Sequence, residues 1–206
     1  MNNMNEIKII SVDFQKEFSA EGGKHYKPRP CVDFIKNTIV PFLRKNNIVI
    51  AEIVSDYRGP RPGDFDDSTR PGEEGYVSEI PDDVKLKNAW IKCMNSPIWI
   101  RENIGNPNKK PGIPYQDPKA FTEWLNSTIG KPEGIEIVLI GLTIDCCVFS
   151  TAQELRWRGY KVKILEEAVD AYSGKLEEKE MILNNPPLLN WAKPISWKDL
   201  KEKLIQ

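Results

Sequence analysis

Residues 135–157, IEIVLIGLTIDCCVFSTAQELRW, decide the fold class of this chain of 206 residues. The first eight residues are an apolar, β-branched run with a single charge, which is typical of a strand buried on both faces of a parallel sheet. A helical pattern follows almost at once, with Val148, Thr151, Ala152 and Leu155 on one side. A buried strand that passes directly into a helix is the repeating unit of an α/β fold.

The alternation of strand and helix continues outward from this unit. Further strands are predicted at residues 7–12, 48–54 and 160–165, with weaker ones at 98–100 and 195–196. Helical patterns occupy residues 32–44, 120–129 and 197–205, and Pro41 should kink the first of them. The pattern predicts a three-layer, Rossmann-like α/β fold, and the length fits one domain over residues 1–206.

Two long segments interrupt the alternation. Residues 57–76 and 102–118 are rich in glycine, proline and polar side chains. In a compact domain such segments are usually functional, so lids or partner contacts are expected here.

Composition excludes several classes of protein. A net charge of −1 gives no basic excess for nucleic acid, and no apolar stretch is long enough for a membrane span. The polar start shows no signal peptide, so a cytoplasmic protein is expected. The four cysteines, at 31, 93, 146 and 147, lack a CxxC spacing and predict free thiols. His25 is the only histidine, so no metal site built on two imidazoles is expected. No other cofactor is expected either.

Candidate catalytic residues follow the predicted strands, because α/β sheets bind ligands at the carboxyl ends of their strands. Cys147 lies at the predicted start of a helix, where the helix dipole and free N–H groups favour a thiolate. A buried cysteine that only packs against the helix is the alternative. Asp13 ends the first strand and is either a proton acceptor for the thiol or a turn residue.

Three segments resemble one known family. Residues 12–18, VDFQKEF, resemble the opening motif of the isochorismatase-like cysteine hydrolases, and residues 141–148, GLTIDCCV, resemble their nucleophile motif. Residues 71–75, PGEEG, are similar to the family's central loop, though less specifically. The resemblance implies a six-stranded parallel sheet between helices and a small-molecule substrate.

The resemblance also implies a triad of Asp, Lys and Cys. Cys147 would be the nucleophile, rather than Cys146, and Asp13 the general base and then acid. A cis peptide bond would lie between Leu142 and Thr143, with the N–H groups of Thr143 and Cys147 forming an oxyanion hole.

The sequence departs from the family pattern at two places. The family lysine follows the third strand, where residues 98–100 are followed by Arg101; Lys109 and Lys110 are the alternatives for this role. The family's nicotinamidases bind a metal through an Asp-x-His pair and a later histidine, of which only Asp56 is present. No metal site is therefore expected.

Together with these residues, the family resemblance implies a metal-independent cysteine amidohydrolase that cleaves a C–N bond in a small amide, ureido or carbamoyl compound through a thioester. A catalytically silent or binding member is the alternative, because an arginine cannot transfer protons as the lysine does. An isochorismate-like or nicotinamide-like substrate is a further alternative. Phe18 and Arg58 are candidate substrate contacts, and a homodimer or homotetramer is expected.

Overall fold

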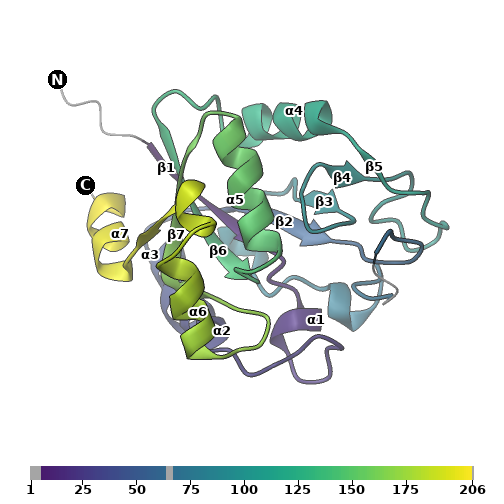
Figure 1. Ribbon diagram of the computed structural model, residues 1–206, viewed down its shortest axis with the longest axis horizontal. Helices are drawn as coiled ribbons and strands as arrows, with labels where there is room; N and C mark the ends of the chain where they lie inside the picture. The colour runs from purple at the N-terminus through teal and green to yellow at the C-terminus, as the bar shows by residue number, and fades with distance from the viewer. Residues whose placement is uncertain (1–5, 64–66, 206) are drawn as a thin grey trace.

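Six parallel strands form the central sheet of the computed structural model, which describes residues 6–63 and 67–205 (Figure 1). Across the sheet the strands lie in the order β3 (Trp90–Lys92), β2 (Ala51–Ser55), β1 (Glu6–Val12), β6 (Ile135–Leu142), β7 (Lys161–Asp170) and β8 (Lys193–Ile195). The strand order reverses between β1 and β6. Doubly wound sheets bind their ligands in the crevice at the carboxyl ends of two such strands.

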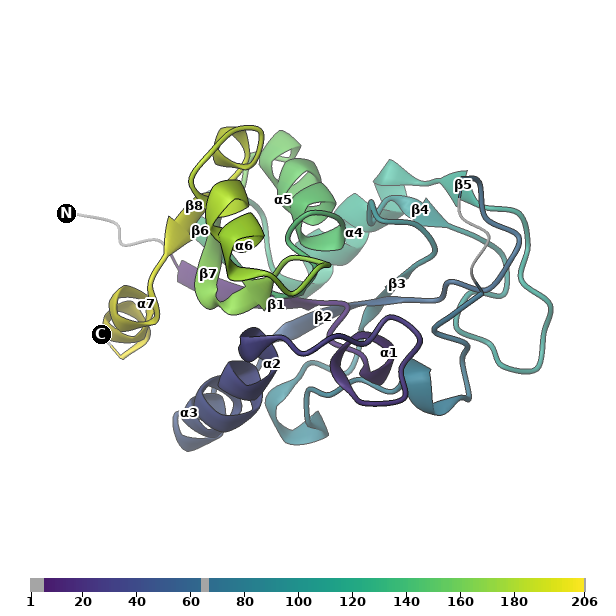
Figure 2. The same cartoon turned by 60° about the horizontal axis from the view of Figure 1, so that its bottom comes forward.

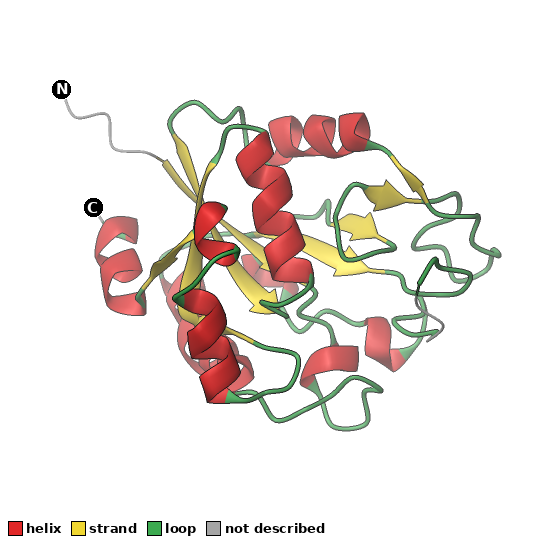
Figure 3. Cartoon of the chain, viewed as in Figure 1, coloured by secondary structure: helices red, strands yellow, loops and turns green. Residues whose placement is uncertain are grey.

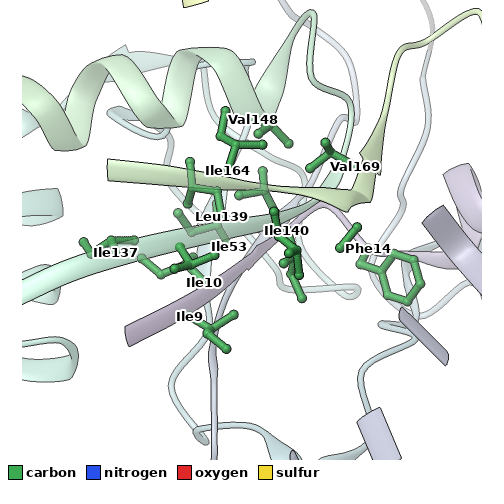
Figure 4. Packing of buried hydrophobic residues seen from close by; sticks show 14 of the residues in the cluster. Ile9, Ile10, Phe14, Ile53, Ile137, Leu139, Ile140, Val148, Ile164 and Val169 are labelled. Carbon is green, nitrogen blue, oxygen red and sulfur yellow. The ribbon is translucent and has the colours of Figure 1, made fainter. Parts of the chain in front are cut away.

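Strands β1 and β6 form the centre of the core. They pair over seven residues, from Glu6 opposite Ile135 to Val12 opposite Gly141, and all eight residues of β6 are buried. Figure 4 shows side chains of β1, β2, β6 and β7 packed together, among them Ile10, Ile53, Leu139 and Ile164. Because both faces of these strands are covered, their sequences are nearly continuous apolar runs.

Helices cover both faces of the sheet, which confirms the predicted three-layer arrangement (Figures 2 and 3). One face carries α2 (Pro30–Phe34) and α3 (Val40–Lys45), and the other carries α4 (Pro118–Thr128), α5 (Cys147–Trp157) and α6 (Leu176–Leu183). The last helix, α7 (Trp197–Leu204), packs against the first pair through the Trp197 ring, which meets the rings of Phe34 and Phe42 edge-on. The four-residue α1 (Lys16–Ser19) follows β1.

Pro41 changes the hydrogen bonding of the first long helical segment. Residues 30–45 are helical throughout, but Ile35–Ile39 between α2 and α3 is π-helical. A proline inside a helix has no N–H to donate, and its ring clashes with the carbonyl four residues earlier. The wider turn just before Pro41 accommodates the ring where the sequence pattern predicted a kink.

The third strand of the sheet differs from the prediction. The predicted strand at residues 98–100 is β4 (Trp99–Ile100), which pairs antiparallel with β5 (Tyr115–Gln116) in a separate two-stranded sheet. The sheet's third strand is instead β3, whose three residues pair with β2. The prediction was wrong because so short an edge strand presents too few residues for a recognisable apolar run.

The two long segments contact each other beside the sheet. The Arg58 guanidinium donates hydrogen bonds to the backbone carbonyls of Asn103, Asn106 and Lys109.

Short 3₁₀ turns lie at Glu74–Tyr76, Asp82–Val84 and Leu188–Asn190. Residues 64–66 of the first segment and the polar start, residues 1–5, lie outside the described residues. Across 6–63 and 67–205, every helix is too short or too polar to cross a bilayer.

Candidate active site

Three strand ends bring the candidate catalytic side chains together. Asp13 directly follows β1, Cys147 is the first residue of α5 beyond the end of β6, and Lys92 is the last residue of β3. All three side chains are buried, with exposed fractions of 1%, 6% and 0%. They therefore lie at the edge of the sheet where the topology predicts a ligand.

Local backbone geometry fixes the position of Asp13. Its φ of 49° is in the left-handed region, and its N–H donates to the carbonyl of Ile53 in β2 at 2.8 Å. Gly141 of β6 lies so close to β1 that a Cβ atom there would be 2.1 Å from the carbonyl oxygen of Val12. Only glycine allows this approach, which brings the ends of β1 and β6 together beneath the site.

The turn between β6 and α5 positions Cys147. The peptide bond between Leu142 and Thr143 is cis, at the place that the family resemblance implies. The Thr143 carbonyl then accepts hydrogen bonds from the N–H groups of Cys146 and Val148, on either side of Cys147. These bonds close a tight turn that brings the thiol to the helix start.

Lys92 connects the other two side chains. Its Nζ lies 2.7 Å from Asp13 Oδ2 and 3.4 Å from Cys147 Sγ. Two hydroxyl oxygens complete its surroundings, Tyr57 Oη at 2.6 Å and Ser55 Oγ at 2.9 Å. An ammonium has three N–H groups and no acceptor, so a buried lysine with these oxygen neighbours is fully satisfied.

Burial and charge together set the protonation of this cluster. Burial opposes the charged form of Lys92, but the neighbouring Asp13 and Cys147 outweigh it and raise the lysine pKa. For Cys147, burial and the Asp13 carboxylate raise the pKa of the thiol well above its ordinary value, although Lys92 and Tyr57 act in the opposite direction. The charge of Lys92 and the proton on the Cys147 thiol are therefore both favoured in the resting cluster.

Asp13 retains one free acceptor. Its Oδ1 is buried and has no hydrogen-bond partner within the described residues, whereas Oδ2 accepts from Lys92. Oδ1 is therefore the oxygen of this carboxylate that is open to a further hydrogen-bond donor.

A cavity of about 240 Å³ opens over the thiol. Its lining combines aromatic rings with a few polar groups: Asp13, Phe18, His25, Tyr57, Asn95, Leu142, Thr143, Cys146, Cys147 and Tyr172. This volume is smaller than that of pockets for drug-sized ligands. The arrangement can therefore hold a small molecule against the buried Cys147 thiol.

Solved structures with the same architecture match almost the whole chain. An isochorismatase-like hydrolase from Alkaliphilus metalliredigens has a TM-score of 0.59 at 20% sequence identity, covering 97% of each chain. A nicotinamidase/pyrazinamidase from Bacillus subtilis has a TM-score of 0.62 at 18% identity, covering 92% of this chain and 98% of that one. This chain has the isochorismatase-like fold. An N-carbamoylsarcosine amidase from Thermoplasma acidophilum, with a TM-score of 0.56 at 17% identity, covers 93% of this chain and 96% of its own.

Sequence comparisons add nothing to this fold assignment. No family model matches the chain, and no curated protein matches it. The similarity to isochorismatase-like hydrolases therefore lies in the three-dimensional structure and in the short motifs.

Lys92, which the sequence analysis missed, occupies the place predicted for Arg101. The prediction placed a cation after the third strand of the sheet, but that strand was misidentified. The Arg101 guanidinium instead donates to the backbone carbonyl of Asp56 at 2.6 Å and lies 3.5 Å from its carboxylate. Lys109 and Lys110 are exposed. The aromatic and β-branched pair Trp90-Ile91 just before Lys92 was the available signal for β3.

The two predicted substrate contacts lie in different surroundings. Phe18 lines the cavity, but Arg58 does not. The Arg58 guanidinium is paired with the Asp56 carboxylate, with Nε 2.9 Å from Oδ1 and Nη2 2.7 Å from Oδ2. The prediction for Arg58 was wrong because a buried carboxylate two residues earlier binds its side chain.

Asp56 does not fit the metal site of the nicotinamidases. Burial works against its charge, but hydrogen bonds from Arg58 and the Gly105 N–H hold the pKa of Asp56 below its ordinary value. Both carboxylate oxygens thus already accept from an arginine. Within the described residues, no group of three or more His, Cys, Asp or Glu side chains could hold a metal.

Proposed function

We propose that this protein is a metal-independent cysteine hydrolase that cleaves a C–N bond in a small amide, ureido or carbamoyl compound. The observation that carries the proposal is the contact of Asp13, Lys92 and Cys147 in one buried cluster beneath a small cavity. A nucleophile, a proton acceptor and a fixed cation within hydrogen-bond reach are the parts that covalent catalysis requires.

In the proposed first step, the Cys147 thiol gives its proton to Asp13 while Sγ forms a bond to the substrate carbonyl carbon. The free Oδ1 is the acceptor that supports this role. The carbonyl π electrons move to the oxygen, and the N–H groups of Thr143 and Cys147 stabilise the resulting oxyanion. Lys92 remains an ammonium and compensates the negative charge of the cluster.

In the second step the tetrahedral intermediate collapses. The C–N bond breaks, Asp13 returns its proton to the leaving nitrogen, and a thioester on Cys147 remains. Water then attacks the thioester carbonyl, giving one proton to Asp13, and the sulfur leaves and recovers that proton as the thiol. The products are an acid and an amine or ammonia, and the enzyme is unchanged.

The alternative of a catalytically silent protein rested on an arginine at the position of the family lysine. That reason no longer applies, because Lys92 supplies an ammonium beside the thiol. The substrate class is tested with a panel of small amides, ureides and carbamoyl compounds, scored by released amine or ammonia. Hydrolysis of a panel member with a thioester on Cys147, seen by mass spectrometry of the intact protein, supports the proposal. If the protein hydrolyses no member of the panel, the proposal is contradicted.

Metal independence has its own test. We expect activity to survive prolonged chelation, because Asp56 is held by two arginines and the chain has one histidine. The positive charges of Arg58 and Arg101 beside this carboxylate disfavour the binding of a metal cation there. Loss of activity on chelation that an added divalent metal restores would show that a metal takes part.

A further inference from the structure

Tyr57 brings a fourth polar group into contact with the triad. It lies two residues after Ser55, the last residue of β2, and its side chain is buried. Its hydroxyl oxygen lies 2.6 Å from Lys92 Nζ, 3.1 Å from Cys147 Sγ and 3.4 Å from Asp13 Oδ2. The roles proposed for Asp13, Lys92 and Cys147 leave this hydroxyl without a function.

Counting donors assigns the direction of these hydrogen bonds. The Lys92 ammonium has three N–H groups, and three oxygens lie within 2.9 Å of its Nζ: Asp13 Oδ2, Ser55 Oγ and Tyr57 Oη. Cys147 Sγ, at 3.4 Å, is the most distant contact of the ammonium. The ammonium therefore stabilises the sulfur mainly through its charge, and no strong N–H donor remains for it.

The Tyr57 hydroxyl can still donate one hydrogen bond. Because its oxygen accepts from Lys92, its own O–H is directed to another acceptor. Cys147 Sγ is closer than Asp13 Oδ2, by 3.1 Å against 3.4 Å, and Oδ2 already accepts from Lys92. The sulfur is thus the better-placed acceptor.

The ring of Tyr57 is held in place on several sides. The Arg61 guanidinium lies 4.0 Å from the ring centroid, and the Phe18 ring meets it edge-on with centroids 6.4 Å apart. The Tyr57 N–H donates to Thr69 Oγ1 at 2.9 Å. Because the Tyr57 side chain is already held in place, its hydroxyl can donate to the sulfur with little further loss of side-chain conformational entropy during the reaction.

We propose that Tyr57 is a catalytic residue whose hydroxyl donates a hydrogen bond to the Cys147 thiolate. The inference rests on the proposed role of Cys147 as nucleophile. As the thiol proton passes to Asp13, the hydrogen bond from the Tyr57 O–H to the sulfur strengthens and carries the polarising effect of Lys92 to it. Burial and the nearby Asp13 and Cys147 raise the pKa of Tyr57 well above its ordinary value, so the phenol keeps its proton throughout.

The test is the rate of Cys147 alkylation by iodoacetamide as a function of pH, which needs no substrate. In Tyr57→Phe the rate constant between pH 7 and 9.5 falls about three- to tenfold, because the thiolate loses a donor worth roughly one pKa unit. Tyr160→Phe is the matched control, since it removes a buried hydroxyl that donates to the Gly130 carbonyl away from the site. Alkylation that remains in Cys147→Ser measures the other thiols.

An unchanged or faster alkylation rate in folded Tyr57→Phe would overturn the inference. If that variant fails to fold, 3-fluorotyrosine placed at position 57 keeps the ring and strengthens the O–H donor, so alkylation should become faster. A rate that stays constant or falls would then contradict the inference. If alkylation is slower in Tyr57→Phe but the native protein hydrolyses no amide, the proposed function is contradicted while the hydrogen bond from Tyr57 is supported. If the native protein hydrolyses an amide but the alkylation rate of Tyr57→Phe is unchanged, the proposed function is supported and the inference about Tyr57 is contradicted.

Discussion

At the residue scale, the least expected feature is a fully buried lysine. Lysine is almost never completely buried unless it is paired, and Lys92 is paired with Asp13 at 2.7 Å. Replacing Lys92 with Met should reduce turnover by roughly 100-fold or more, because the negative charge that develops on the thiolate and oxyanion loses its nearest cation. Turnover is measured on whichever panel compound the native protein hydrolyses.

Stability must be separated from chemistry in this variant. Lys92→Met leaves the Asp13 carboxylate buried and unpaired, which costs about 3–5 kcal/mol of unfolding free energy. The double variant Lys92→Met/Asp13→Asn removes both charges and should recover stability without recovering turnover. Native turnover in folded Lys92→Met would show that the ammonium has no part in the reaction.

Arg58 is expected to be structural. Its guanidinium connects Asp56 to three backbone carbonyls of the segment 102–118. Arg58→Met should lower the unfolding free energy by about 3 kcal/mol or more, because Asp56 loses its bidentate partner while buried. Arg70→Met, which breaks an exposed pair with Asp67, should cost less than about 1 kcal/mol. Denaturant unfolding measures both, and equal losses would contradict the assignment.

At the scale of elements, the close contact of β6 with β1 has a specific requirement. A side chain at Gly141, where φ is 110°, would meet the Val12 backbone. Gly141→Ala should therefore cost about 2–4 kcal/mol and displace the strand end that carries Asp13. Gly134→Ala is the matched control, since φ there is also positive, at 79°, but no atom lies within 4 Å. It should cost only about 1–2 kcal/mol. Equal unfolding free energies of the two variants would contradict this account.

The strands also show how far sequence predicts this fold and its site. The runs in β1, β6 and β7 are predictable because strands covered on both faces need continuous apolar side chains. The motifs around Asp13 and Cys147 lie at the ends of two of these strands, so the sequence points to both residues as candidates. Lys92 was missed because β3 has three residues and ends in a charge that ordinarily indicates solvent. Only its pairing with β2 and its contact with Asp13 explain its burial.

At the scale of the whole molecule, buried acids with raised pKa values make stability depend on pH. Burial raises the pKa of Cys93 to about 11, so the folded protein keeps this proton where the unfolded chain releases it. Stability is therefore present below the ordinary thiol pKa and falls as pH rises from about 8.5 to about 11, by about 1.4 kcal/mol per pH unit for this group.

The comparison of two pH profiles isolates this contribution. The unfolding free energy of Cys93→Ala should fall less steeply between pH 8.5 and 10.5 than that of the native protein, by about 1.4 kcal/mol per pH unit. The lost hydrogen bond from the Cys93 thiol to the Trp99 carbonyl shifts the whole profile but not its slope. Parallel profiles would mean that Cys93 is not protonated more strongly in the folded protein.

The central claim is that Cys147, and not its neighbour Cys146, attacks the substrate. Both cysteines line the same cavity, but only Cys147 contacts Lys92 and Tyr57. The most direct test is amine or ammonia release by Cys147→Ala and Cys146→Ala on the panel compound that the native protein hydrolyses. We predict that Cys147→Ala is folded and inactive, whereas Cys146→Ala keeps most of its activity. Retained activity in Cys147→Ala, or equal loss in both variants, would contradict the account.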